Sequence, residues 1–154
     1  MRQFKTVCAL FAAVALLGIS PGAQAQSATI QENALGFCGV QGTVDSNHSG
    51  YSGTGFANGN NATGAGIDWS VNVAASGVYQ LEWRFANGST SRPGNVKVNG
   101  TTATTVSFPS TGVWTSWTTV NTTVNLNAGW NSIRLEATTS ALSASPHLSS
   151  RTPV

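Results

Sequence analysis

Charged side chains are scarce in this sequence. Asp, Glu, Lys and Arg make up 8% of its 154 residues, whereas an average soluble domain holds about 25%. No basic patch is visible, so the sequence does not indicate a nucleic-acid partner. Its polar character comes instead from Asn, Ser and Thr. Amides and hydroxyls both donate and accept hydrogen bonds, so this composition suits neutral polar ligands.

Cysteine and histidine are rare, with two residues of each. Cys8 lies in an N-terminal segment that we expect to be removed, so Cys38 is the only cysteine of the mature chain and no internal disulfide is expected. Phe37 beside it favours a buried residue over a thiol awaiting a partner. Neither His48 nor His147 belongs to a recognisable triad motif, so nucleophilic catalysis is not indicated.

Long apolar runs are absent except at residues 7–19, a stretch too short to span a bilayer as a helix. Arg2 and Lys5 precede it, and an A-x-A pattern at residues 23–25 follows it. These features predict a secretory signal peptide over residues 1–25, with the product exported to the periplasm or the medium and no membrane anchor. The remaining chain is long enough for one domain. It has five basic and five acidic residues, and we expect a monomer.

Helical periodicity is missing as well, whereas strand periodicity is frequent. Apolar and polar residues alternate along several stretches, which is typical of strands with one buried face. Turn pairs such as Asn87-Gly88 and Asn99-Gly100 separate them. The spacing predicts an all-β fold, an antiparallel β-sandwich or jelly roll. The expected strands cover residues 28–33, 54–57, 67–73, 79–85, 95–99, 104–108, 120–126 and 133–137.

Residues 36–66 differ from the rest, because they are rich in Gly, Asn and Ser and poor in aliphatic residues. A structureless loop of that length inside a small domain would be unusual. We therefore expect the short strand at residues 54–57 to be flanked by loops. Binding loops on a rigid scaffold have this composition.

Several stretches, taken in order, resemble carbohydrate-binding modules of families 35 and 6. They are QENA, GYSGTGF, VNVAASGVYQLEWRFANGS, RPGNVKVNG, TGVWTSWTT and VNLNAGWNSIRLEATT. The loop GFCGVQGTVDSNHSGYSGTGF is most similar to family-35 modules attached to pectate lyases and related enzymes. The resemblance implies a jelly-roll module over residues 26–140 that binds polysaccharide beside a catalytic domain. Residues 141–154 would then be an atypical C-terminal tail.

The pair Trp114 and Trp117 is where the resemblance and the strand pattern disagree. The resemblance places Trp114 against sugar and Trp117 in the core, and a rigid aromatic plane matches the C–H face of a sugar. On a regular strand, however, Trp114 would share its face with Val120 and the apolar series that follows. Alternation alone would therefore bury Trp114. A bulge or bend between the two tryptophans would reconcile both expectations.

Three further residues are implied at the sugar site by their match to the family's loops: Tyr51, Asn87 and Arg92. An arginine grips a carboxylate with two parallel hydrogen bonds, which would fit a uronic acid. Two of these positions have an alternative. Tyr51 could pack as the closing residue of the sandwich, and Arg92 could be a surface residue stiffened by Pro93.

The resemblance also implies a structural calcium ion, with Glu32 as a ligand and Asp45 as a second contributor. Carboxylates and backbone carbonyls are suitable ligands for this cation. The alternative for Glu32 is an exposed strand residue. Ile30, Ala144 and Pro146 occupy positions where the families carry an acid, an Asn and an Asp. These departures weaken the expectation of both the calcium site and the sugar site.

The sequence therefore predicts a secreted, non-catalytic module for plant cell-wall glycans that are pectic or otherwise carry uronic acids. Its five acidic residues are scattered, so they do not supply the two neighbouring carboxylates of a glycosidase. Two alternatives remain open at this point. One is a fragment of a polysaccharide lyase or hydrolase, and the other is a structural or adhesive sandwich domain without a sugar site.

Overall fold

The structure, a computed structural model, describes residues 28–139 and the strand at 143–147. The signal peptide expected at residues 1–25 lies outside the described residues. The part that is described contains no helix that could span a membrane. Its strands are β1 (Phe37–Val40), β2 (Gly42–Asp45), β3 (Phe56–Gly59), β4 (Gly66–Val73), β5 (Gly77–Ala86), β6 (Arg92–Val98), β7 (Thr101–Phe108), β8 (Trp117–Leu126), β9 (Gly129–Ala137) and β10 (Ser143–His147).

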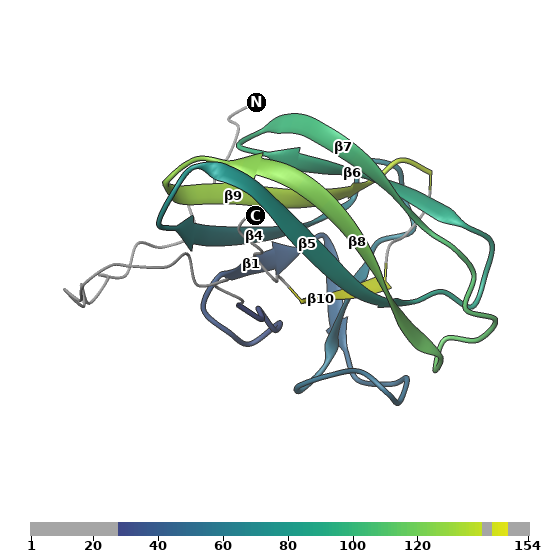
Figure 1. The fold of residues 1–154 in the computed structure, drawn as a ribbon. Helices are drawn as coiled ribbons and strands as arrows, with labels where there is room; N and C mark the ends of the chain where they lie inside the picture. Colours follow the sequence, from purple (N-terminus) through teal and green to yellow (C-terminus); the bar gives the residue numbers. More distant parts are fainter. Residues whose placement is uncertain (1–27, 140–142, 148–154) are drawn as a thin grey trace, which may run out of the picture.

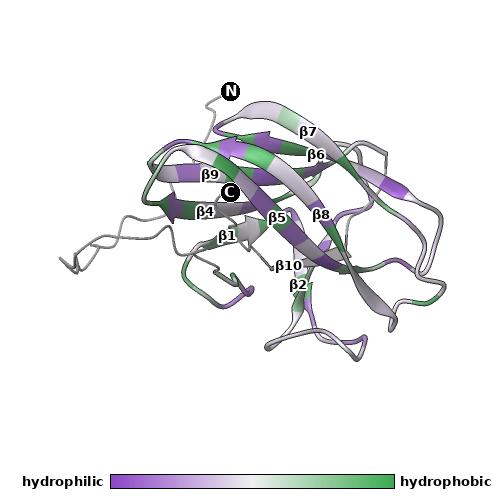
Figure 2. Ribbon diagram, viewed as in Figure 1, coloured by the Kyte–Doolittle hydropathy of each residue, from purple (hydrophilic) through white to green (hydrophobic). Residues whose placement is uncertain are grey.

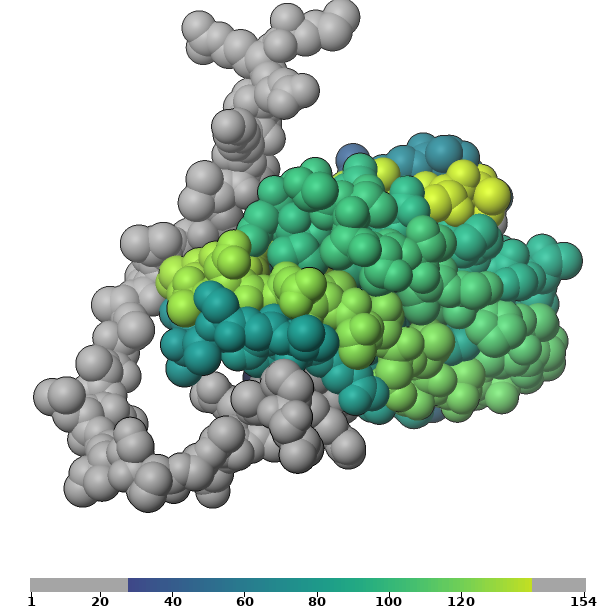
Figure 3. Space-filling model, turned by 45° about the horizontal axis from the view of Figure 1, so that its top comes forward, coloured from purple at the N-terminus to yellow at the C-terminus, as the bar shows by residue number. Residues whose placement is uncertain are grey.

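The strands form two antiparallel sheets that face each other (Figure 1). The first sheet has the order β1-β4-β9-β6-β7, and the second has the order β2-β3-β10-β5-β8. The longest pairing joins β5 to β8 from Gly77↔Leu126 to Ala86↔Trp117. Figure 3 shows the teal residues of β5 beside the light-green residues of β8. The predicted antiparallel β-sandwich is confirmed.

The core lies between the sheets and follows from the alternating pattern. On β5, Tyr79, Leu81, Trp83 and Phe85 are buried while the residues between them are half-exposed. The same alternation appears as green and purple bands along β5 and β9 in Figure 2. Two aromatic pairs join the layers, Trp69 with Trp83 at a centroid distance of 5.3 Å and Phe85 with Phe108 at 5.0 Å. Large aromatic side chains bury much apolar surface, so these pairs are central to the stability of the sandwich.

The N-terminal third differs from the sequence prediction. Residues 28–33 do not form a strand, and a turn bond from the Ala34 amide to the Gln31 carbonyl lies there instead. The strand expected at 54–57 appears as β3, Phe56–Gly59. The strands β1 and β2 were not predicted, because the glycines at 36, 39 and 42 interrupt any alternation. Gly42 has φ of +156°, and a Cβ there would lie 2.0 Å from the Asn58 carbonyl oxygen, so only glycine fits where β2 meets β3.

The strand β10 corrects the predicted domain boundary. Residues 143–147, expected in a tail outside the module, lie between β3 and β5 in the second sheet. Ala144 pairs with both Ala57 and Phe85, and Pro146 lies opposite Trp83. The sandwich therefore continues to at least His147, and the boundary at residue 140 is too early.

Cys38 lies half-buried on β1. Its sulfur lies 3.7 Å from the Gly36 carbonyl oxygen. The expectation that the processed chain has no internal disulfide stays a prediction.

Candidate functional site

Three loops meet at one end of the sandwich, and together they contain most of the residues expected to bind ligand. They are residues 46–55 between β2 and β3, 87–91 between β5 and β6, and 109–116 between β7 and β8. The amide of Thr111 donates to the carbonyl of Asn87 over 2.7 Å, which joins the second loop to the third. His48 stacks near Trp114, which joins the first loop to the third. We call residues 46–55, 87–91 and 109–116 the loop cluster.

Phe56 is the buried centre beneath the first of these loops. It is 2% exposed, yet it does not belong to the core between the sheets. Ala57 faces that core, so the pleat of β3 directs Phe56 to the opposite side. There it contacts Trp117 at a centroid distance of 5.3 Å, Tyr51 at 6.0 Å and His48 at 6.1 Å. These rings form a small hydrophobic cluster of their own outside the second sheet.

Trp117 fixes the first loop to the sheet. Its indole N–H donates to the Ser49 carbonyl over 3.0 Å, and the Arg84 guanidinium lies 5.7 Å from its ring centre. Gly50 has φ of +96°, and a Cβ there would lie 2.8 Å from the Trp117 ring. Only glycine therefore allows this close approach. Trp117 is half-buried and anchors a loop.

The expected place of Trp117 in the sandwich core is consequently wrong. Val120, Val124 and Leu126 turn inward from β8, and strand side chains alternate between the two faces. Trp117 is an odd number of residues away from each of these three inward positions. It therefore points outward, together with Thr119 and Asn121. The alternation along the strand thus predicted its direction, and the resemblance did not.

Trp114 lies in the loop cluster, as expected, and precedes β8. Because it is not on the strand, the alternation that would have buried it does not apply and no bulge is needed. Its half-buried ring lies 4.9 Å from the Arg92 guanidinium carbon and 6.3 Å from the His48 ring, which is inclined by only 18°. A Cβ at Gly88 would lie 2.7 Å from the ring. The surrounding loops therefore hold the indole in one orientation.

Arg92 begins β6 and places its guanidinium over the Trp114 ring. Partial burial lowers the pKa of Arg92, but an arginine remains a cation at any physiological pH. The contact is a cation–π interaction, which limits the orientations of the guanidinium plane. A guanidinium held this way is suited to pairing with a carboxylate. Tyr51, half-buried against Phe56, belongs to the same cluster of rings.

Asn87 is 2% exposed, and its amide bonds within the protein. Its Nδ2 donates to the carbonyls of Thr90 and Phe108 over 2.8 and 2.9 Å, and its Oδ1 accepts from the Ser89 amide over 3.1 Å. These bonds hold the second loop against the end of β7. The structure thus places Asn87 beneath the loop cluster, where it positions the loops and does not reach the surface.

Glu32 and Asp45, the expected calcium ligands, have different surroundings. Glu32 is 8% exposed, and its Oε1 accepts a 3.3 Å hydrogen bond from the Ala57 amide. The pairing of β3 with β10 ends at the same residue, Ala57. A carboxylate is one of the oxygen donors that calcium prefers. Glu32 is therefore not the exposed strand residue of the alternative, and the calcium site at Glu32 stays a prediction.

Asp45 is held by side-chain hydrogen bonds within the second sheet. Its Oδ2 accepts a 2.8 Å hydrogen bond from the side-chain amide of Asn58. Side-chain hydrogen bonds from Asn58 and Thr43 lower the pKa of the Asp45 carboxyl group. These bonds engage the carboxylate near the surface of β2. Among the residues that the structure describes, no three His, Cys, Asp or Glu side chains come together. A calcium ion at Glu32 would depend mainly on backbone oxygens.

Comparison with known proteins identifies the fold and the family of this chain. The family of carbohydrate-binding modules known as family 6 matches residues 33–145. The chain belongs to this family. A family-35 module from Cellvibrio japonicus Abf62 is 43% identical with a TM-score of 0.74, covering 81% of this chain and 90% of its own. The expected membership of the family 6 and 35 group is confirmed.

Two other relatives extend the comparison. A family-35 module, Xyl-CBM35, solved in complex with a disaccharide containing glucuronic acid, is 40% identical with a TM-score of 0.70, covering 81% of this chain and 96% of its own. Endo-1,4-beta-xylanase B of Cellvibrio japonicus (strain Ueda107) is 47% identical over 113 residues, which are 71% of this chain and 19% of the xylanase. The chain thus spans about a fifth of the length of this relative. The matched residues are a non-catalytic carbohydrate-binding module, of a kind found within larger catalytic proteins.

Sequence reasoning missed His48, Phe56 and Arg84 as members of the site. The sequence presents His48 only as a possible catalytic residue and Phe56 only as part of a short strand. The available signal was the density of aromatic rings and glycines in SNHSGYSGTGF, since glycines beside rings often mark close packing of a loop. Nothing in the sequence pattern showed that Arg84, on the polar face of its strand, would lie near the Trp117 ring.

Proposed function

We propose that this module binds uronic-acid-bearing polysaccharides of the plant cell wall at its loop cluster. The observation that carries the proposal is the Arg92 guanidinium over the Trp114 ring, 4.9 Å from the ring centre. The indole offers an apolar plane for a sugar ring, and the guanidinium offers paired donors for the carboxylate of a uronic acid.

The charges around the rings support an acidic ligand. A second guanidinium, that of Arg84, lies 5.7 Å from the Trp117 ring centre, so two cations accompany the aromatic cluster. The related module solved with a glucuronic-acid-containing disaccharide is consistent with the same ligand chemistry.

The biological role follows from this binding. We propose that the protein is secreted and that the module holds its polysaccharide close to a catalytic domain. Tethering raises the local concentration of substrate without altering the chemistry of the reaction. Xylan substituted with glucuronic acid is the first candidate, and pectin is the second.

The test compares an acidic polymer with its neutral counterpart. Affinity electrophoresis and isothermal titration calorimetry would use glucuronoxylan and the same glucuronoxylan after chemical reduction of its carboxyl groups. We expect the protein to bind the acidic polymer at least tenfold more tightly and Arg92→Ala to remove that preference. Arg92→Lys should restore it only in part, because an ammonium lacks the planar fork.

Lys97→Gln is the matched control, because it removes one positive charge from the same strand at a site paired with Glu136. It should leave the preference intact. Equal binding of the reduced and acidic polymers would overturn the uronic-acid proposal. An equal loss in Lys97→Gln would show that net charge, and not Arg92, is responsible.

A further inference from the structure

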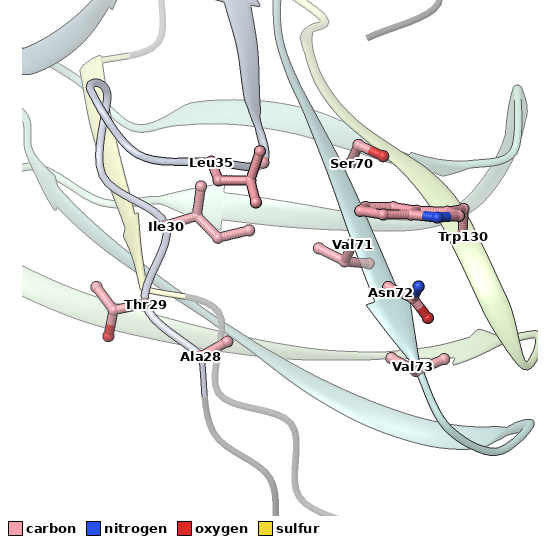
Figure 4. A pocket seen from close by; sticks show the side chains of 10 residues that line it. Ala28, Thr29, Ile30, Leu35, Ser70, Val71, Asn72, Val73 and Trp130 are labelled. Atoms are coloured by element: carbon pink, nitrogen blue, oxygen red, sulfur yellow. The ribbon is translucent and has the colours of Figure 1, made fainter. Parts of the chain in front are cut away.

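A second surface feature lies on the first sheet, away from the loop cluster. A pocket of about 210 Å³ opens between the segment at residues 28–30, Leu35, the end of β4 and Trp130 at the start of β9 (Figure 4). We propose that it is a second sugar-binding site, which takes a single unit of a neutral glycan. The inference extends the carbohydrate-binding role but does not depend on a uronic acid or on the loop cluster.

Trp130 is the main evidence for this site. It is 47% exposed, whereas Trp69 and Trp83 are 2% and 0% exposed and Trp114 and Trp117 are half-buried among other rings. A large exposed aromatic side chain leaves much apolar surface in water, and a contiguous exposed apolar patch indicates a binding surface. Leu35, at 78% exposure, adds further apolar surface at the pocket.

Polar groups stand next to this apolar surface. Asn72 lies directly opposite Trp130 in the pairing of β4 with β9, and Figure 4 shows its side chain beside the indole. Ser70, two residues earlier, is on the same face and also lines the pocket. The pairing of β1 with β4 stops at Trp69, and the Ser70 amide then donates to the Gly36 carbonyl. Among the described residues, β4 thus extends beyond its pairing with β1, and this part of β4 lines the pocket.

Charge distinguishes among ligands for this pocket. None of its ten lining residues is charged. The nearby ionic groups of the first sheet are paired with one another, Arg134 with Asp68 at 2.7 Å and Lys97 with Glu136 at 2.6 Å. A phosphate, a uronate or a nucleic acid would find no compensating charge there. An aromatic plane beside an amide and a hydroxyl instead matches a neutral sugar ring.

Size supports one sugar unit. Pockets for drug-sized ligands measure roughly 300–1,000 Å³, and this pocket is smaller. The site would thus contact one residue of a neutral chain or its end. Two sites on different faces would let one module contact two chains, or two places on one chain, with a gain in avidity.

The experiment uses the protein as secreted and three neutral probes: xylohexaose, cellohexaose and mannohexaose. Nuclear magnetic resonance would follow the five indole N–H signals during titration. We expect at least one probe to shift the Trp130 signal, and Trp130→Ala to weaken binding of that probe at least tenfold. Trp130→Ala should leave glucuronoxylan binding at the loop cluster unchanged, and Trp114→Ala should leave the neutral probe bound.

Other outcomes would overturn the proposal. They include an unshifted Trp130 signal with all three probes, or unchanged binding of the shifting probe to Trp130→Ala. Sedimentation velocity would test whether a second copy of this chain occupies the pocket. A dimer that is dissociated by Trp130→Ala would assign the pocket to that second copy and not to a sugar. If Trp130→Ala fails to fold, the titration of the unaltered protein decides alone. Failure of the uronic-acid test leaves these results interpretable, because the neutral probes carry no carboxylate.

Discussion

Arg92 and Trp114 come from different parts of the chain, yet the guanidinium carbon of one lies 4.9 Å from the ring centre of the other. The strand β6 supplies the cation, and the loop before β8 supplies the ring. Each side chain therefore limits the freedom of its partner before any ligand arrives. Such preorganisation lowers the entropic cost of binding.

This contact predicts that the two residues act as a unit in ligand binding. Trp114→Ala and Arg92→Ala should each weaken glucuronoxylan binding, and the double variant should be little weaker than either single variant. The stability cost of Trp114→Ala should stay below about 1 kcal/mol, because the ring is half-exposed. Calorimetry and urea unfolding of the four proteins would measure both effects. Fully additive losses would show that the two side chains bind ligand independently.

Trp117→Ala should loosen the first loop without unfolding the sandwich. The substitution removes the ring contact with Phe56 and the hydrogen bond to Ser49, and we expect a loss of about 1–3 kcal/mol in the free energy of unfolding. Trp83→Ala is the core control, with an expected loss of about 3–5 kcal/mol. Urea unfolding and limited proteolysis within residues 46–55 would test the difference. Equal losses in the two variants would place Trp117 energetically in the core.

Asn87→Ala should act through the position of the loops. It leaves the Thr90 and Phe108 carbonyls without their side-chain donor, and an unmet buried hydrogen bond costs about 1–3 kcal/mol. Asn125→Ala, at an exposed position on β8, is the control and should change stability by less than about 0.5 kcal/mol. Thermal unfolding and ligand titration would be measured together. An Asn87→Ala protein of unaltered stability that no longer binds would instead show direct contact of the amide with the ligand.

Calcium should stabilise the folded protein if Glu32 is one of its ligands. An ion that binds only the folded state raises the melting temperature by mass action. Glu32→Gln keeps the shape of the side chain and removes its charge, so it should abolish the calcium-dependent rise. Differential scanning calorimetry with calcium and with a chelator would measure both proteins. An unchanged melting temperature of the unaltered protein in excess calcium would exclude this ion from the fold.

Acid should weaken the ionic group on the first sheet. A hydrogen bond from Lys97, followed by one from Arg134, holds the pKa of Glu136 below its ordinary value of 4.5. A lowered carboxyl pKa stabilises the folded state above the unfolded value, and this contribution is lost as the pH falls through the folded value. Glu136→Gln should therefore lower the free energy of unfolding near neutral pH by less than about 1 kcal/mol. The difference from the unaltered protein should shrink as the pH falls below the ordinary carboxyl value of 4.5, as measured by urea unfolding. A constant difference would contradict the assigned pKa direction.

Much of the sandwich could be predicted from the sequence because its strands alternate cleanly. Ile67, Trp69 and Val71 face one way while Asp68 and Ser70 face the other, and this pattern gives both the strand and its buried side. The strands β1 and β2 escaped prediction because glycines interrupt their pattern. The strand β10 escaped because its sequence, SASPH, contains a proline and no apolar alternation.

The candidate site was harder to predict than the fold. Resemblance identified Trp114, Tyr51 and Arg92 as residues of one region, and the structure brings their loops together. It misjudged Trp117, since the direction of a side chain depends on where its strand begins. The resemblance also implied that Asn87 contacts the ligand. Asn87 is instead buried, and its three internal hydrogen bonds position the loops. Such differences depend on local packing, which a motif does not record.

The position of β10 has a consequence for biosynthesis. This strand, at residues 143–147, is the link between β3 and β5 within the second sheet. Until this strand has been synthesised, β3 and β5 each present an open edge, and open edges invite pairing with other chains. The final closure of the second sheet must therefore wait for residues 143–147. Premature termination before Ser143 should yield a protein that aggregates.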